Sequence, residues 1–384
     1  MFDSLLLFGI FISLLMGQFA RIELINALAN VYIHEFFLFV FICTSIIRFG
    51  LLPLQNAFKS KKISAFFLFL LLSFSISIRE FTMQQNSIAA LYLVRIILYM
   101  LFGIYLFVHI ESNKNIRILL SKLIYVFSIF LLIITAIQYV FFPNFWGLYA
   151  FGWDPHLYRA SAVYLDVFIA AALYGILVFF WFEKKRWVLS LLFVVALVLT
   201  FSRSGYVAFV LSMLFFFISK REWRKVLVSI SLFALFVILV PKPFGEGGNL
   251  MRTSSINSRI LDYKLGITLW QKKPLFGFGY NRIRFAKEQL NLVSIDDRSH
   301  SLSSFHSSFL IILVTTGLVG FISFILLIGF LFRKYRIIRV YLVYILVMSL
   351  FDNVLLHVLV MLPMLFIAAH LIKKDSVHSQ SSLE

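Results

Sequence analysis

The chain has 384 residues, 61% of them hydrophobic and 47 of them Phe, and its mean hydropathy is +0.96. Soluble globular domains average about 45–50% apolar residues, so this composition excludes an ordinary water-soluble domain. Lys and Arg outnumber Asp and Glu by 35 − 17 = 18. On a soluble protein that excess would indicate nucleic-acid binding, but here the basic residues follow the loops of a membrane protein.

Twelve apolar segments recur along the chain, most of them long enough to cross a bilayer. In chain order they are residues 4–20, 31–52, 63–78, 88–110, 118–142, 161–182, 187–201, 205–219, 225–240, 305–332, 337–351 and 354–372. Asp3 stands where a secretory leader would carry basic residues, so we expect the first segment to be a membrane span. The sequence therefore predicts an all-α polytopic protein with about twelve transmembrane helices, forming a single membrane domain over residues 1–384.

Basic clusters follow every second predicted span. They are Lys59/Lys61/Lys62, Lys114/Arg117/Lys122, Lys184/Lys185/Arg186, Lys220/Arg221/Arg224/Lys225, Arg333/Lys334/Arg336 and Lys373/Lys374. Lys and Arg accumulate in cytoplasmic loops, so we expect these loops and both termini on the cytoplasmic side of a bacterial inner membrane. Cys43 is the only cysteine, which excludes an intramolecular disulfide.

The longest stretch between predicted spans, residues 241–304, is expected on the outer side of the membrane, between the ninth and tenth spans. It carries ten Lys and Arg against five Asp and Glu. Because this excess opposes the usual distribution, we expect an anionic partner there, such as a lipid-linked phosphate or diphosphate. The alternative is a solvated loop that touches lipid headgroups.

Within this loop, residues 254–270 predict a short amphipathic helix that ends before Pro274. Its apolar face would lie on the membrane, and its polar face would carry Arg259 and Lys264. A glycine-containing turn with aromatic residues follows at 275–280 and suits a membrane interface. Its glycines alone are a weak indication of phosphate binding.

Two further polar groups are expected at the outer ends of spans. Arg203 links the seventh and eighth spans, and His306 opens the tenth. An Arg at a helix end can simply extend towards the interface, and a His at a helix start can be a surface or capping residue. We favour a functional site because Arg203, Arg259 and His306 are all predicted on one side of the membrane.

Inside the bilayer, Arg95 and Asp166 are predicted at matching depths in the fourth and sixth spans. An unpaired charge is costly there, so we expect an ion pair between them with a structural role. The His residues are scattered, without the spacing of metal ligands, and no nucleotide-binding motif is present. We therefore expect no metal and no cofactor.

Several of these segments together resemble the O-antigen ligase/polymerase superfamily of bacterial membrane glycosyltransferases. Residues 199–205, Leu-Thr-Phe-Ser-Arg-Ser-Gly, are similar to its Thr-x-Ser-Arg segment. Asn257-Ser258-Arg259 and the turn 274–280 follow in the family's order. His306-Ser307, with Gly317 and Gly320, matches its His-[Asn/Ser/Gln]-x9-Gly-x-x-[Gly/Thr/Tyr] signature. The resemblance covers about residues 199–331.

The resemblance implies transfer of a glycan from an undecaprenyl-diphosphate donor to an acceptor hydroxyl on the outer side of the membrane, in O-antigen or surface polysaccharide assembly. Arg203 and Arg259 would bind the diphosphate, and His306 would act as the base. The acceptor would be a lipid-linked glycan for a polymerase or lipid A core for a ligase, and the motifs slightly favour a polymerase. Partners would be these substrates, membrane lipids and other polysaccharide-assembly proteins, with no nucleic acid. Additional substrate contacts are expected from Lys264, Tyr263, Arg282, Arg298, His300 and Arg159.

The alternative function is a transporter or flippase for lipid-linked oligosaccharides, because Arg95 and Asp166 could line a path through the membrane. The long asymmetric outer loop and the absence of a visible inverted repeat argue against it.

Overall fold

A computed structural model describes residues 2–24, 29–149, 158–241, 248–250, 253–292 and 304–381. The chain forms two compact units, each assembled from segments that are far apart in the sequence. The first unit comprises Met1–Leu14, Ala20–Leu120 and Asn257–Arg336. The second comprises Leu15–Phe19, Ser121–Ile256 and Ile337–Glu384.

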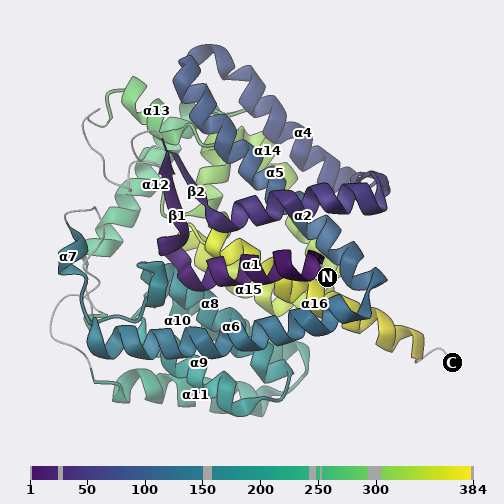
Figure 1. Ribbon diagram of the computed structural model, residues 1–384. Helices are drawn as coiled ribbons and strands as arrows, with labels where there is room; N and C mark the ends of the chain where they lie inside the picture. The colour runs from purple at the N-terminus through teal and green to yellow at the C-terminus, as the bar shows by residue number, and fades with distance from the viewer. Residues whose placement is uncertain are drawn as a thin grey trace. The chain divides into compact units, whose positions relative to one another are not determined.

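The first unit is helical apart from one short hairpin in its described residues (Figure 1). The elements that belong to it wholly or for the most part are α1 (Phe2–Met16), β1 (Arg21–Leu24), β2 (Ala29–Tyr32), α2 (Ile33–Phe49), α3 (Leu52–Phe58), α4 (Lys61–Ile76), η2 (Ile78–Glu80), α5 (Met83–Ser112), α12 (Ser254–Lys272), α13 (Ile283–Gln289) and α14 (Ser308–Lys334). The two strands pair antiparallel, with Arg21 opposite Tyr32 and Glu23 opposite Asn30. This hairpin is an addition to the all-α prediction.

Helix α14 is interrupted at Gly317, whose φ of 65° places it in the left-handed region. The turn after α12 supplies hydrogen bonds at this break: Pro274 O accepts from Leu318 N at 2.8 Å, and Gly279 N donates to Thr315 O at 2.8 Å. A Cβ on Gly317 would lie 2.2 Å from Leu275 O, so only glycine fits this close approach. The turn at 275–280 is therefore a structural partner of α14, which also packs against α4 (Figure 1).

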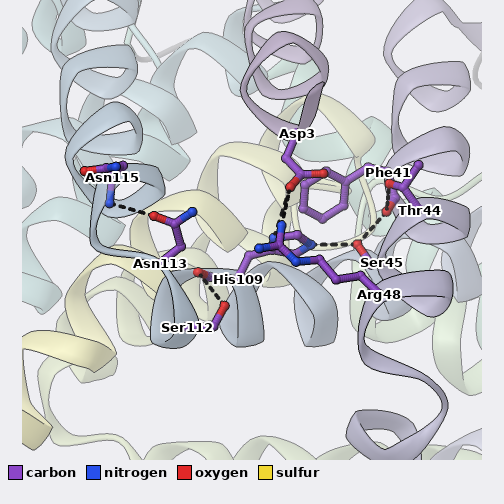
Figure 2. Close-up of polar contacts among 9 residues, drawn as sticks. All are labelled: Asp3, Phe41, Thr44, Ser45, Arg48, His109, Ser112, Asn113 and Asn115. Atoms are coloured by element: carbon purple, nitrogen blue, oxygen red, sulfur yellow. Dashed lines mark hydrogen bonds and ion pairs between the residues drawn. The ribbon is translucent and has the colours of Figure 1, made fainter. Parts of the chain in front are cut away.

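A polar cluster joins α1, α2 and α5 (Figure 2). Arg48 pairs with Asp3 at 2.9 Å, and the buried His109 shares a hydrogen bond of 2.9 Å with Ser45. Asp3 also lies 3.8 Å from the His109 ring nitrogen Nδ1. The Arg48–Asp3 pair keeps both charges partnered at the ends of apolar helices, where an unpaired charge would be costly.

The ion pair expected between Arg95 and Asp166 stays a prediction, because the two residues belong to different units, and each has another partner in the structure. Arg95, on α5, pairs with Glu35 of α2 at 2.5 Å and also donates to the carbonyl of Asn30 on β2. Asp166 precedes α8 (Val167–Glu183) and caps it by accepting from Phe168 N at 3.2 Å. The sixth apolar segment begins six residues before its α-helix, so Asp166 is a capping residue and not a mid-helix charge.

The second unit is built around α8, nearly all of whose residues are buried. The elements that lie in this unit wholly or for the most part are η1 (Gly17–Ala20), α6 (Lys114–Phe141), α7 (Trp146–Tyr149), η3 (Ala162–Tyr164), α8, α9 (Trp187–Leu199), α10 (Arg203–Ser219), α11 (Trp223–Leu239), η6 (Arg336–Ile338), α15 (Arg339–Phe351) and α16 (Val358–Ser381). Helix α8 is apolar on all sides, and α9, α10, α15 and α16 pack against it. Tyr344 donates to Ala171 O at 2.7 Å, beside Gly175, where any side chain would collide with the Tyr344 ring.

Each of the twelve predicted apolar segments contains a helix, which confirms a helical, multi-pass membrane protein. Among the described residues, five helical stretches are long and apolar enough to cross a bilayer: Phe2–Ala20, Lys61–Glu80, Met83–Ser112, Lys114–Phe141 and Ser308–Lys334. Helices α2 and α3 would make a sixth span, bent by 100°. A straight span needs about 20 residues, which α8, α9 and α10 do not reach. The total of twelve spans therefore remains a prediction.

Candidate functional site

The candidate site in the first unit centres on His306, two residues before α14. Its backbone N–H donates to Asp262 Oδ2 at 3.0 Å, and its ring nitrogen Nδ1 forms a short contact with the same oxygen. A carboxylate accepts hydrogen bonds, so Nδ1 carries the proton and Nε2 keeps its lone pair when the imidazole is neutral. The His306 side chain is 40% exposed, so Nε2 can meet a substrate.

Helix α12 presents Asp262 to His306 because its neighbouring face packs against α14. Gly266 allows this contact: a Cβ there would lie 2.5 Å from the Leu310 side chain. Arg259 precedes Asp262 by three residues, so the two lie on one side of α12, and Arg259 is half-buried. Tyr263 is half-buried beside them.

Lys264 does not share the face of Arg259, contrary to the expected single polar face. Five residues separate the two, which places them roughly 140° apart around an α-helix. Lys264 is exposed on the side that also carries the exposed Ile260, Leu261 and Ile267. The exposed side of α12 is thus mixed, and the polar groups near His306 come from the packed side.

The charges around Asp262 favour its ionised form. Burial alone would raise its pKa, but the hydrogen bonds and charge of His306, together with the charge of Lys287, hold the pKa of Asp262 below its ordinary value. Lys287 comes from α13 and is 1% exposed. Burial lowers the pKa of Lys287, and the nearby Asp262 carboxylate opposes that shift.

Arg282 was expected to contact substrate, and the structure gives it a different role. Its side chain is 0% exposed. Its guanidinium donates to Phe74 O at 2.8 Å and to Asn86 Oδ1 at 2.5 Å, and it lies 4.0 Å from the centre of the Phe74 ring. Burial lowers the pKa of Arg282 to about 10. Arg282 therefore anchors the segment before α13 to α4 and α5.

In the second unit, Arg203 is the first residue of α10, directly after the N-cap Ser202, whose side chain accepts from Gly205 N at 3.2 Å. The Arg203 guanidinium donates to Leu250 O at 3.2 Å and remains half-buried. Arg159 lies at the same junction, donating to Thr200 O at 2.9 Å. The α9–α10 junction thus holds two guanidinium groups.

Arg298 and His300 lie outside the described residues. Within the residues that are described, no group of three or more His, Cys, Asp or Glu side chains gathers as metal ligands would. The sequence reasoning missed Asp262 and Lys287. One signal could have indicated Asp262: it is an acid on the same helical side as Arg259, in a segment with few acids.

Comparison with protein-family models gives a match over residues 188–325, and the matching model describes O-antigen ligase. The matched region runs from α9 into α14 and includes Arg203, Arg259, Asp262 and His306. A comparison with curated proteins gives no match for this chain.

Proposed function

Because the chain belongs to the O-antigen ligase/polymerase superfamily, we propose that it moves a glycan from an undecaprenyl-diphosphate donor to an acceptor hydroxyl on the outer side of the bacterial inner membrane. Its general activity is that of a membrane glycosyltransferase acting on lipid-linked glycans. The observation that carries the proposal is the His306–Asp262 contact, which has the form of a base oriented by a carboxylate.

In the proposed reaction, Nε2 of His306 takes the proton of the acceptor hydroxyl. The acceptor oxygen then bonds to the anomeric carbon of the donor sugar, and the bond from that carbon to the diphosphate oxygen breaks. Undecaprenyl diphosphate leaves with the electron pair. Asp262 holds the ring orientation and stabilises the imidazolium that forms.

The leaving diphosphate gains negative charge, so cations beside it lower the barrier. Arg259 suits this role because it is half-buried one turn before Asp262 and offers a planar set of donors. Arg203 is proposed as a second diphosphate ligand on the strength of its motif. Lys264, Tyr263 and Arg159, with Arg298 and His300, remain proposed contacts to donor or acceptor.

We favour a polymerase over a ligase on the Ser-Arg-Ser-Gly segment and the glycine-aromatic turn. The transport alternative loses its main support, because Arg95 is paired with Glu35 and Asp166 caps α8. Neither charge needs a transport path to explain it.

The test is a transfer assay with purified full-length protein and a lipid-linked glycan repeat, with lipid A core supplied or withheld. Lengthened lipid-linked chains without core would support a polymerase, and product only with core would support a ligase. If folded protein forms no product from donors of several compositions, but moves lipid-linked glycan across liposomes, the transferase proposal is wrong.

A further inference from the structure

Lys287 is a buried ammonium group that the proposed reaction does not use. It belongs to α13 and is 1% exposed. Its Nζ donates to Ser304 O at 3.1 Å and lies 4.4 Å from the centre of the Phe305 ring. These are the two residues directly before His306, so Lys287 fixes the position of the backbone segment that carries the imidazole.

The same ammonium acts electrostatically on Asp262, the carboxylate that contacts Nδ1 of His306. Burying an ammonium group is costly unless its partners compensate, and an apolar side chain of similar volume would fill the space without that cost. Packing alone therefore does not explain a lysine at this position. Lys287 contacts the backbone directly before His306 and acts electrostatically on Asp262, so both of its interactions involve groups that hold the imidazole.

We infer that Lys287 is a positioning residue for His306, because it holds the Ser304–Phe305 segment directly before the imidazole. Its positive charge also favours the carboxylate form of Asp262. This inference rests on the proposed transferase function. The two helices beside the His306–Asp262 pair carry other charges near it in sequence: α12 has Arg259 one turn before Asp262, and α13 has the Arg284–Glu288 ion pair on either side of Lys287. Lys287 is the cation of α13 that acts on Asp262.

Removal of this cation should let the His306–Asp262 pair bind a proton more readily, because a nearby positive charge opposes protonation. The acidic limb of the profile of kcat/KM against pH would then move to higher pH. In addition, a displaced imidazole would lower kcat/KM at its optimum by up to about 100-fold.

The experiment uses full-length protein in detergent with three substitutions: Lys287→Met removes charge and donor, Lys287→Gln keeps a donor, and Lys287→Arg keeps both. Lys272→Met is the control, because Lys272 is exposed at the end of α12 and outside the proposed site. One readout is the pH profile of glycan transfer. The other is the rate at which diethyl pyrocarbonate modifies His306, followed by peptide mass spectrometry from pH 5 to 8.

We expect both pH midpoints to rise in Lys287→Met and Lys287→Gln, to stay near wild type in Lys287→Arg, and to be unchanged in Lys272→Met. Unchanged midpoints and unchanged kcat/KM in Lys287→Met, while His306→Ala abolishes transfer, would overturn the inference and leave the transferase proposal standing. The inference would also be overturned if neither Lys287→Met nor Lys287→Gln folds, because Lys287 would then have a structural role. The modification of His306 by diethyl pyrocarbonate is measured without substrate. If its pH midpoint shifts in Lys287→Met but the wild-type protein shows no glycan transfer, the inference about Lys287 stands and the proposed transferase function is wrong.

Discussion

A single carboxylate oxygen, Oδ2 of Asp262, contacts both the backbone N–H and the ring Nδ1 of His306, 44 residues further along the chain. Two contacts to one oxygen fix the rotation of the imidazole relative to its own backbone. Since Nδ1 faces Asp262, the exposed edge of the ring carries Nε2. The orientation of the proposed base is thus set by α12 before any substrate binds.

Asp262→Asn should lower kcat by about 100-fold or more, with a smaller effect on KM. An Asn amide can donate to Nδ1, which would place the proton on Nε2 and remove the lone pair that the reaction needs. The corresponding change in a serine-protease triad costs about 10,000-fold. Steady-state transfer kinetics measure the effect, and a kcat within about two-fold of wild type would contradict the assigned role of Asp262.

Arg282→Ala should lower stability and Arg259→Ala should weaken donor binding, although the sequence suggested substrate contact for both residues. Arg282 is 0% exposed and donates to Phe74 O and Asn86 Oδ1, so its loss leaves a cavity and two acceptors without this donor. We expect Arg282→Ala to lower the free energy of unfolding by about 2–4 kcal/mol. Arg259→Ala should keep its thermal stability and lose donor binding. Thermal unfolding in detergent and a donor-binding assay separate the two, and equal stability of both variants would contradict this distinction.

Gly317→Ala should destabilise the protein by at least about 2 kcal/mol. Its φ of 65° is unfavourable for alanine, and the added Cβ would lie 2.2 Å from Leu275 O. Gly329→Ala, in the same helix, is the matched control, because a Cβ at Gly329 meets nothing within 4 Å. The unfolding temperatures of the two variants give the comparison. Similar unfolding temperatures for Gly317→Ala and Gly329→Ala would contradict the close approach of Leu275 to the break in α14.

Glu35→Gln should be strongly destabilising, because Arg95 would keep its charge at a site where its side chain is only 13% exposed. Breaking one side of a buried ion pair costs about 3–5 kcal/mol. The double variant Glu35→Gln/Arg95→Gln should recover part of this loss, since it removes the unpaired charge as well. Recovery is incomplete because Arg95 also donates to the carbonyl of Asn30, which the shorter Gln side chain reaches less well. A double-mutant cycle without coupling would show that the pair is not stabilising.

Hydropathy and charge were sufficient to predict the helical membrane fold and to place Arg203 and His306 at helix starts, because these features depend on local sequence. The partners of buried charges were not predictable in this way. Glu35 meets Arg95 only because a short hairpin leads into α2. Asp262 meets His306 only because Gly266 lets α12 approach Leu310 of α14.

Arg282 shows the same limit. In the sequence it is one of ten basic residues in the predicted outer loop, and only its contacts with α4 and α5 distinguish it from an exposed cation. The glycine-aromatic turn likewise became interpretable only when its hydrogen bonds to the break in α14 were known.

The most direct test of the central claim, that His306 is the base, is a single-turnover experiment with donor bound before acceptor is added. His306→Ala should bind the lipid-linked donor as wild type does and transfer its glycan about 100- to 10,000-fold more slowly. Lys272→Met should behave as wild type in both steps. Normal donor binding with a wild-type transfer rate in His306→Ala would contradict the account.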